Sequence, residues 1–161
     1  MGQLNLRQKP SGFFRLFLHA PVWVFRARLG FVFGSRIVML EHTGRRTGKV
    51  RRTPLEVVWR AEDSYVLCSG TGAHADWFRN IRTNPATGLW VGRQRHSVEQ
   101  RFLEDSEAAT TFTKYESAHP KAAARLTALT GVAHDGTHKG RMAMVARIPM
   151  VEMRLRRPES R

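Results

Sequence analysis

Apolar residues along most of the chain occur in short runs that often alternate with polar residues, the pattern of β-strands with one buried face. Turn-forming residues separate the runs, and residues 43–48 (TGRRTG) divide the first from the second. In residues 142–148 every second residue is apolar, which predicts another strand that Pro149 interrupts. Residues 89–91 and 97–103 are expected to pair as a hairpin. The predicted strands are 36–41, 50–60, 64–69, 89–91, 97–103, 142–148 and 151–155.

Helical signals are fewer and lie between these runs. The predicted helices are residues 76–82, ended by Asn84 and Pro85; residues 107–118, with Ser106 as N-cap; and a helix from Pro120 that stops at Gly131. Because hairpins rather than long helices join the strands, a doubly wound parallel sheet is excluded. The pattern predicts an α+β, mainly β fold: a small antiparallel barrel with a few peripheral helices.

The first 35 residues differ from the rest of the chain. They contain no acidic residue, and their basic residues are interleaved with Phe and Trp. We therefore divide the chain into a basic amphipathic segment, residues 1–35, with helices over 11–19 and 21–29, and a barrel domain, residues 36–161. Segments of this kind lie on anionic lipid surfaces, so we predict peripheral membrane contact through residues 11–34. The alternative is a helix that packs on the protein's own core.

The composition is that of a globular protein with a large basic excess. The 161 residues include 27 Lys and Arg against 13 Asp and Glu, a formal net charge of +14. The single cysteine, Cys68, excludes an internal disulfide and suits a reducing compartment, so we expect a cytoplasmic protein, free or peripheral on the inner membrane face. Cys68 lies in an apolar run, which favours a buried side chain over a nucleophile. The scattered histidines have no metal-ligand spacing, and no nucleic-acid recognition signature is present, so neither a metal nor a nucleic acid is expected.

Two turns have the features of an anion site. The first carries a basic cluster with no acidic residue inside it: Arg45, Arg46, Lys49, Arg51 and Arg52. The second, residues 70–75 (GTGAHA), leads into the helix that begins at Asp76, where free backbone N–H groups attract anions. The first turn is one residue short of a P-loop, and the second lacks the βαβ unit of a dinucleotide site. If both turns converge, with Trp77 and Phe78 as an apolar wall, they suit a phosphate-bearing aromatic cofactor.

Two segments together resemble the deazaflavin-dependent nitroreductase family: TGRRTGKVRRTPL from Thr43, and GAHADWFRNIRTNP from Gly72. The resemblance runs from about Val38 to Leu155. It implies a split β-barrel that binds coenzyme F-420, a hydride-carrying flavin analogue. It also implies an oxidoreductase that transfers hydride to an electron-poor small-molecule acceptor such as a quinone or a nitro compound. Some members of the family are dimers, so a homodimer is a further expectation.

The same resemblance implies a set of cofactor-binding residues. The basic turn matches residues that hold the phosphate and acidic tail, the following strand runs along the cofactor, and the next strand ends near the deazaflavin. The implied residues are Arg45, Arg46 and Thr47; Arg51, Arg52, Thr53, Pro54, Leu55 and Glu56; Ser69 and Gly70; and Asp76, Trp77, Phe78, Arg79 and Asn80. Gly70 replaces a lysine of other members, and residues 135–140 replace a tyrosine-containing stretch. A relative that binds FMN, FAD or haem, or one without catalysis, is therefore the first alternative. A basic module that binds a membrane or a nucleic acid is the second, and no catalytic residue is assigned.

Overall fold

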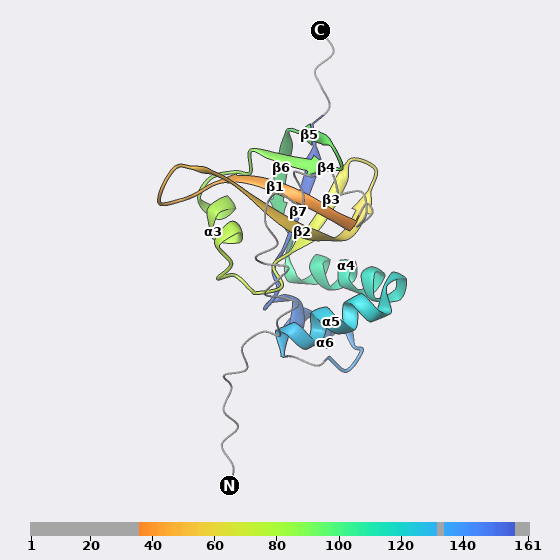
Figure 1. Ribbon diagram of the computed structural model, residues 1–161. Helices are drawn as coiled ribbons and strands as arrows, with labels where there is room; N and C mark the ends of the chain where they lie inside the picture. The colour runs from red at the N-terminus through yellow and green to blue at the C-terminus, as the bar shows by residue number, and fades with distance from the viewer. Residues whose placement is uncertain (1–35, 132–133, 157–161) are drawn as a thin grey trace.

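A computed structural model describes residues 36–131 and 134–156 of the chain, and the expectations for residues 1–35 lie outside these ranges. A curved antiparallel sheet is flanked by helices, with α4, α5 and α6 gathered on one side and α3 on another (Figure 1). The strands are β1 (Ile37–Thr43), β2 (Val50–Ala61), β3 (Ser64–Cys68), β4 (Gly88–Val91), β5 (Gln94–His96), β6 (Val98–Phe102) and β7 (Met150–Leu155). The helices are α3 (Asp76–Thr83), α4 (Asp105–Ala118), α5 (Pro120–Thr130) and α6 (His138–Val145).

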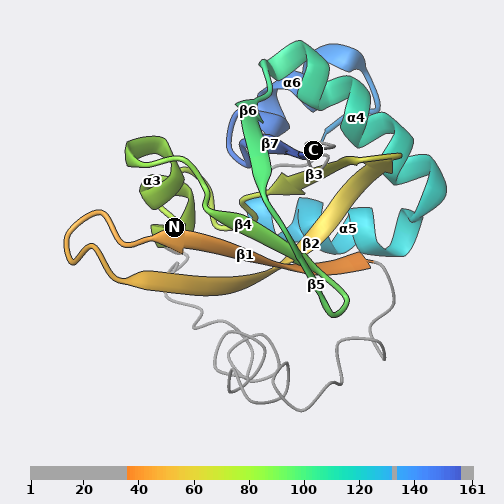
Figure 2. The same ribbon diagram turned by 90° about the horizontal axis from the view of Figure 1, so that it is seen from above.

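The sheet curls into a nearly closed barrel because its two edge strands are neighbours in sequence. The strand order is β5-β4-β1-β2-β3-β7-β6, and a single residue, Ser97, separates β5 from β6. The two edges must therefore meet, as Figure 2 shows for the continuous run from β6 to β5. The predicted fold class, a mainly β antiparallel barrel with peripheral helices, is confirmed.

Strand β2 belongs to both halves of the barrel. Its first part, through Glu56, pairs with β1, and its last part, from Val57, pairs with β3. The register shifts between Val57 and Trp59, and such a bulge bends a strand and increases its twist. This bend allows one long strand to pass from one half of the barrel to the other.

Alternate residues of the strands face two separate apolar cores. In β3, Tyr65 and Leu67 lie in the barrel interior, whereas Val66 and Cys68 pack against the α4–α6 side. Cys68 is buried, as predicted, and burial raises the pKa of its thiol to about 12, so it stays protonated. The barrel interior also contains Phe78 of α3, which brings this helix close to the β1–β2 hairpin.

Within the described residues, the predicted elements other than residues 142–148 are present, but two details were wrong. The hairpin predicted between residues 89–91 and 97–103 does not form, because the chain turns at Gly92 so that β4 pairs with the short β5. Residues 98–102 instead pair with β7. Helix α4 begins at Asp105 after Glu104, so Ser106 is not its N-cap.

The strand predicted over residues 142–148 is also wrong, because residues 138–145 form α6. Thr137 caps this helix, its hydroxyl accepting a hydrogen bond from the Gly140 N–H at 3.0 Å. Met144, Val145 and Ile148 are the buried residues, and this spacing follows one helical face rather than strict alternation. The strand was predicted because every second residue of 142–148 is apolar, a pattern that this helix also contains.

Glu41 on β1 is a buried carboxylate whose oxygens are surrounded by donors. Arg95 Nη2 lies 2.7 Å from Oε1, Arg52 Nε lies 3.0 Å from Oε2, and Trp90 Nε1 lies 3.4 Å from Oε2. Burial raises the pKa of Glu41, but the hydrogen bonds from Arg95, Arg52 and Trp90 outweigh it and hold the pKa below its ordinary value. The ionised carboxylate thus joins β1, β2, β4 and β5 on the outer face of the barrel.

We expect Glu41→Gln to lower the free energy of unfolding by about 2 kcal/mol, since the neutral amide turns one donor toward guanidiniums that need an acceptor. Equilibrium unfolding in urea measures this change. Glu99→Gln on the exposed face of β6 is the matched control and should change stability by less than about 0.5 kcal/mol. Equal stability of the two variants would show that the buried carboxylate does not stabilise the barrel.

Candidate functional site

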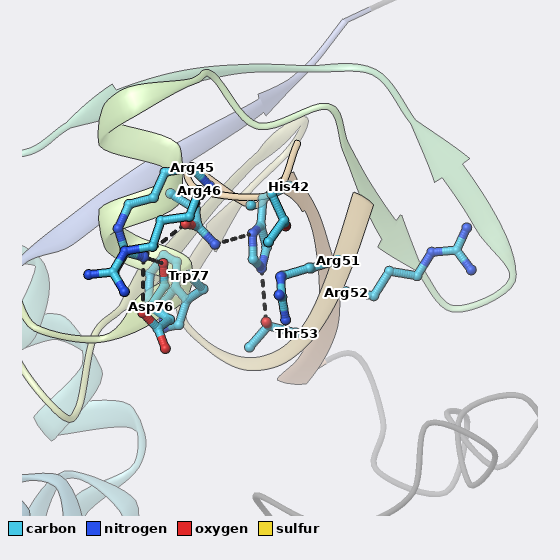
Figure 3. A pocket seen from close by; sticks show the side chains of 11 residues that line it. His42, Arg45, Arg46, Arg51, Arg52, Thr53, Asp76 and Trp77 are labelled. Carbon is cyan, nitrogen blue, oxygen red and sulfur yellow. Dashed lines mark hydrogen bonds and ion pairs between the residues drawn. The ribbon is translucent and has the colours of Figure 1, made fainter. Parts of the chain in front are cut away.

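A cavity of about 360 Å³ lies where the β1–β2 hairpin faces α3 (Figure 3). Its volume is within the range of about 300–1,000 Å³ that is usual for small-molecule sites. The basic turn and the helix that begins at Asp76 therefore border one cavity, whereas residues 70–75 of the glycine-rich turn, which were expected to converge on it, are not in its lining. The lining residues are His42, Gly44, Arg45, Arg46, Thr47, Arg51, Arg52, Thr53, Asp76, Trp77 and Asn80.

Backbone hydrogen bonds and close packing fix the basic turn. The Gly44 N–H donates to the carbonyl of Lys49 at 2.8 Å, and the Gly48 N–H donates to the carbonyl of Gly44 at 2.8 Å. A Cβ atom on Gly44 would lie 2.9 Å from Thr47 Oγ1 and 3.0 Å from Arg51 Nε. Gly44 therefore lets both side chains lie directly against the turn.

Strand alternation decides which residues of β2 face the cavity. Arg51 and Thr53 point to the side of His42, whereas the Arg52 side chain points away (Figure 3). The Arg52 guanidinium is bound to Glu41 and lies over the Trp90 ring at 5.1 Å from its centroid. Consecutive residues of a strand cannot all face one ligand, so only part of the predicted run 51–56 can do so.

Arg45 is held in place by α3. Its guanidinium Nη1 donates to Asp76 Oδ1 at 2.9 Å and to Asn80 Oδ1 at 3.0 Å, and its backbone N–H donates to Asn80 Oδ1 at 3.1 Å. The hydrogen bond and the charge of Arg45 hold the pKa of the Asp76 carboxyl below its ordinary value. The basic turn is thereby tied to the helix, and one of its positive charges is already paired.

A buried histidine, His42, connects α3 with β2. Its Nδ1 lies 3.2 Å from Asn80 Nδ2, and its Nε2 lies 3.0 Å from Thr53 Oγ1. Burial and the charge of Arg51 lower the pKa of His42, while Asp76 acts in the opposite direction with a smaller effect. His42 is therefore neutral at pH 7.

Two other arginines of the cavity keep their charge available. Within residues 36–131 and 134–156, neither the Arg46 nor the Arg51 side chain forms an ion pair with an acidic residue. Asp76 is the acidic residue in the lining, and it is bound to Arg45. The cavity thus presents unpaired guanidiniums, which bind phosphate or carboxylate oxygens.

The structure brings together most of the residues implied by the resemblance, but not all of them. Leu55 and Phe78 pack in the barrel core, and Glu56 pairs with Arg36. Ser69 is buried and donates to the Gly72 carbonyl at 2.6 Å. Those that do not line the cavity are Pro54, Leu55, Glu56, Ser69, Gly70, Phe78 and Arg79, and their roles stay predictions.

Sequence reasoning missed two residues of the lining, His42 and Gly44. The sequence pattern indicated only that Gly44 belongs to a turn, although a glycine between a strand and two arginines is also typical of a position where side chains pack closely against the backbone. His42 had a weaker signal, since a lone histidine at the end of a strand has no spacing to distinguish it. Its hydrogen-bond partners Thr53 and Asn80 are distant in sequence.

A larger depression of about 800 Å³ lies between α4 and the strands β2, β3, β6 and β7, but both arginines of its lining are paired with carboxylates. Arg101 forms ion pairs with Glu107 at 2.6 Å and Glu152 at 2.8 Å. The Ser64 hydroxyl also donates to Glu152. The smaller cavity is the better candidate for an anionic ligand because two of its arginines, Arg46 and Arg51, form no ion pair with a carboxylate among the described residues.

Several known proteins resemble this chain. A Mycobacterium tuberculosis (strain ATCC 25618 / H37Rv) protein named "Putative F420H(2)-dependent quinone reductase Rv3178" is 30% identical over 86 residues, which cover 51% of this chain and 72% of that protein. A solved F420-H2 dependent reductase, FDR-A, has a TM-score of 0.51 at 24% identity and covers 73% of this chain and 93% of its own. A solved domain-swapped dimer has a TM-score of 0.53 at 21% identity, over 90% of this chain and 99% of its own. The two structures show the same fold.

The chain belongs to the F420H(2)-dependent quinone reductase family, whose model matches residues 22–131. It is an oxidoreductase whose cofactor is coenzyme F-420 and which acts on quinones. The resemblance to deazaflavin-dependent enzymes is thereby confirmed, and FMN, FAD and haem are set aside.

We expect Gly44→Ala to weaken binding of coenzyme F-420 about tenfold, because the added methyl group displaces Arg51 from the cavity. Titration of the cofactor's fluorescence measures this affinity. Gly88→Ala is the matched control, since its Cβ would lie 3.0 Å from the Arg95 guanidinium, which is outside the cavity lining. If Gly44→Ala binds the cofactor as tightly as Gly88→Ala does, the close packing of the turn is not needed for the site.

Proposed function

We propose that the cavity between the β1–β2 hairpin and α3 is the binding site for coenzyme F-420 in this quinone reductase. The phosphate and acidic tail of the cofactor would lie at Arg46, Arg51 and Thr47. The observation that carries the proposal is that Arg46 and Arg51, alone of the cavity's arginine side chains, have no carboxylate partner among the described residues. The tail carries a phosphodiester and carboxylates, so it supplies the acceptors that these guanidiniums lack.

The donor set of the cavity fits an anionic ligand and also discriminates against cations. Arg46 and Arg51 are charge-assisted donors, and the exposed Thr47 adds a hydroxyl beside them. The carboxylate of Asp76 is turned to Arg45 and helps to position that arginine. The arginines also compensate for Gly70, which stands at the position of a lysine in other members of the family.

Trp77 supplies the apolar part of the lining. Its side chain is buried and packs edge-to-face on Phe78, with ring centroids 5.5 Å apart. A rigid aromatic wall beside the arginines would exclude water and orient a bound aromatic molecule. When bound and reduced, the deazaflavin supplies the hydride that a quinone accepts, and the chain contributes binding, orientation and exclusion of water.

Three further expectations remain proposals. Reduction of nitro compounds would follow from the same hydride chemistry. We also propose a homodimer and a peripheral contact of residues 11–34 with an anionic membrane. Neither proposal depends on the cavity being the cofactor site. Among the helices of residues 36–131 and 134–156, none is both long and apolar enough to span a membrane. Sedimentation with anionic liposomes, compared between the full chain and a variant lacking residues 1–34, would test the membrane contact.

The double variant Arg46→Gln/Arg51→Gln should weaken binding of coenzyme F-420 by at least about 100-fold, since each charge-assisted hydrogen bond contributes about 1.5–3 kcal/mol. The measurement is a fluorescence titration of the cofactor at two salt concentrations, followed by quinone reduction with the reduced cofactor. The wild-type affinity should fall as the salt concentration rises.

Arg82→Gln/Arg93→Gln is the matched control, because it removes the same charge from exposed positions outside the cavity. We expect this control to bind nearly as tightly as the wild type. If both double variants lose the same affinity, attraction by net charge accounts for binding, and the cavity is not the site of the tail.

A further inference from the structure

The Thr53 hydroxyl is the last member of a hydrogen-bond chain that starts at the basic turn and ends in the wall of the cavity. The chain runs from Arg45 to Asn80, from Asn80 to His42 and from His42 to Thr53. Figure 3 shows the last two of these bonds as dashed lines beside Arg51. The chemistry of the atoms involved fixes which group is the donor in each of these bonds.

The orientation of the Asn80 amide is fixed by Arg45. Two groups that can only donate, the backbone N–H and the guanidinium Nη1 of Arg45, lie 3.1 Å and 3.0 Å from one end of this amide. That end must be the oxygen, Oδ1. The amide nitrogen, Nδ2, is then the atom that faces His42, and it can only donate.

The orientation of Asn80 in turn fixes the proton of His42. Because Nδ1 of the ring faces a donor, it must be the unprotonated acceptor, so the proton lies on Nε2. Nε2–H then donates to Thr53 Oγ1 at 3.0 Å. Since Thr53 Oγ1 accepts this bond, the hydroxyl keeps its own proton for another acceptor. Among the described residues, no hydrogen bond donated by Thr53 is present, and its side chain lines the cavity.

The surroundings of His42 keep it neutral. An imidazolium would point a second N–H at the Asn80 NH₂ group. Two charged groups act on the ring: Arg51 of β2 lowers its pKa, and Asp76 of α3 raises it by a smaller amount. The Asp76 carboxylate is itself paired with Arg45 of the turn. Glu41, the residue before His42 in β1, is turned to Arg52 and Arg95 on the opposite face of the strand.

We propose that His42 is a positioning residue for the cofactor: it directs the Thr53 hydroxyl proton into the cavity, where it is donated to an anionic oxygen of the tail of coenzyme F-420. This inference rests on the proposed function of the cavity. Thr53 then acts together with Arg46 and Arg51 as a neutral donor. Such a group of donors binds the anionic oxygens of phosphate and carboxylate groups more strongly than it binds hydroxyl oxygens.

Thr53 is tested with two variants and two ligands. Thr53→Val keeps the shape of the side chain and removes the hydroxyl, whereas Thr53→Ser keeps the hydroxyl. We expect Thr53→Val to weaken binding of coenzyme F-420 about tenfold, and Thr53→Ser to restore it. A deazaflavin riboside without phosphate or glutamates should bind equally well to wild type and Thr53→Val. An unchanged affinity of Thr53→Val for coenzyme F-420, or the same loss for both ligands, would overturn the inference.

The role of His42 is tested by the position of its ring proton and by a variant that should preserve its two hydrogen bonds. In the ligand-free protein, the ¹⁵N shifts of the ring should show a protonated Nε2 and a bare Nδ1, and the opposite tautomer would overturn the inference. His42→Gln offers an amide oxygen to Asn80 and an amide N–H to Thr53, so it should keep the affinity within about threefold. His42→Leu should lose about tenfold, as Thr53→Val does.

The two hypotheses fail in different ways. A folded wild-type protein that does not bind coenzyme F-420 contradicts the proposed function of the cavity. A wild-type protein that binds the cofactor, together with His42→Leu that binds it equally well, contradicts the inference alone. Thermal unfolding of each variant shows whether the hairpin and α3 remain folded.

Discussion

The pairing of β1 with β2 is the constraint on which the rest of the structure depends. Val38 and Leu40 of β1 share the interior face of this ladder with Leu55 of β2, and they pack in the barrel core. Farther along the same face, the register places His42 opposite Arg51. The cavity is therefore the polar end of the barrel interior. A shift of one residue in this register would move the core residues to the surface and turn the arginine out of the cavity.

The same alternation explains how much of the site could be predicted from the sequence. The basic turn and the helix at Asp76 were predicted because their signals are local: glycines, consecutive arginines and an acidic first helical residue. It was not predicted that residues 51–56 face two sides of β2, because the family resemblance implied that all six of them bind the cofactor. His42 was not predicted, because its role depends on hydrogen bonds with Thr53 and Asn80, which are distant from it in the sequence.

The fold shows a similar limit. Strand periodicity indicated β1, β2, β3 and β7, but it does not specify which strands pair. A single residue between β5 and β6 carries the chain from one edge of the sheet to the other, and no turn motif marks it. In residues 138–145 the apolar residues fit alternation and a helix almost equally well. The capping hydroxyl of Thr137 is the local feature that distinguishes the two.

The distribution of charge partners explains why a strongly basic protein has a selective site rather than a uniformly attractive surface. Glu41 binds Arg52 and Arg95 on the outside of the barrel, and Asp76 binds Arg45 at the edge of the cavity. These carboxylates fix the arginines that hold the structure together, while Arg46 and Arg51 line the cavity without an ion pair to a carboxylate among the described residues. A polyanionic ligand supplies the acceptors that these two guanidiniums lack. Since the neighbouring side chains are already positioned by hydrogen bonds, little further ordering is required of them when the ligand binds.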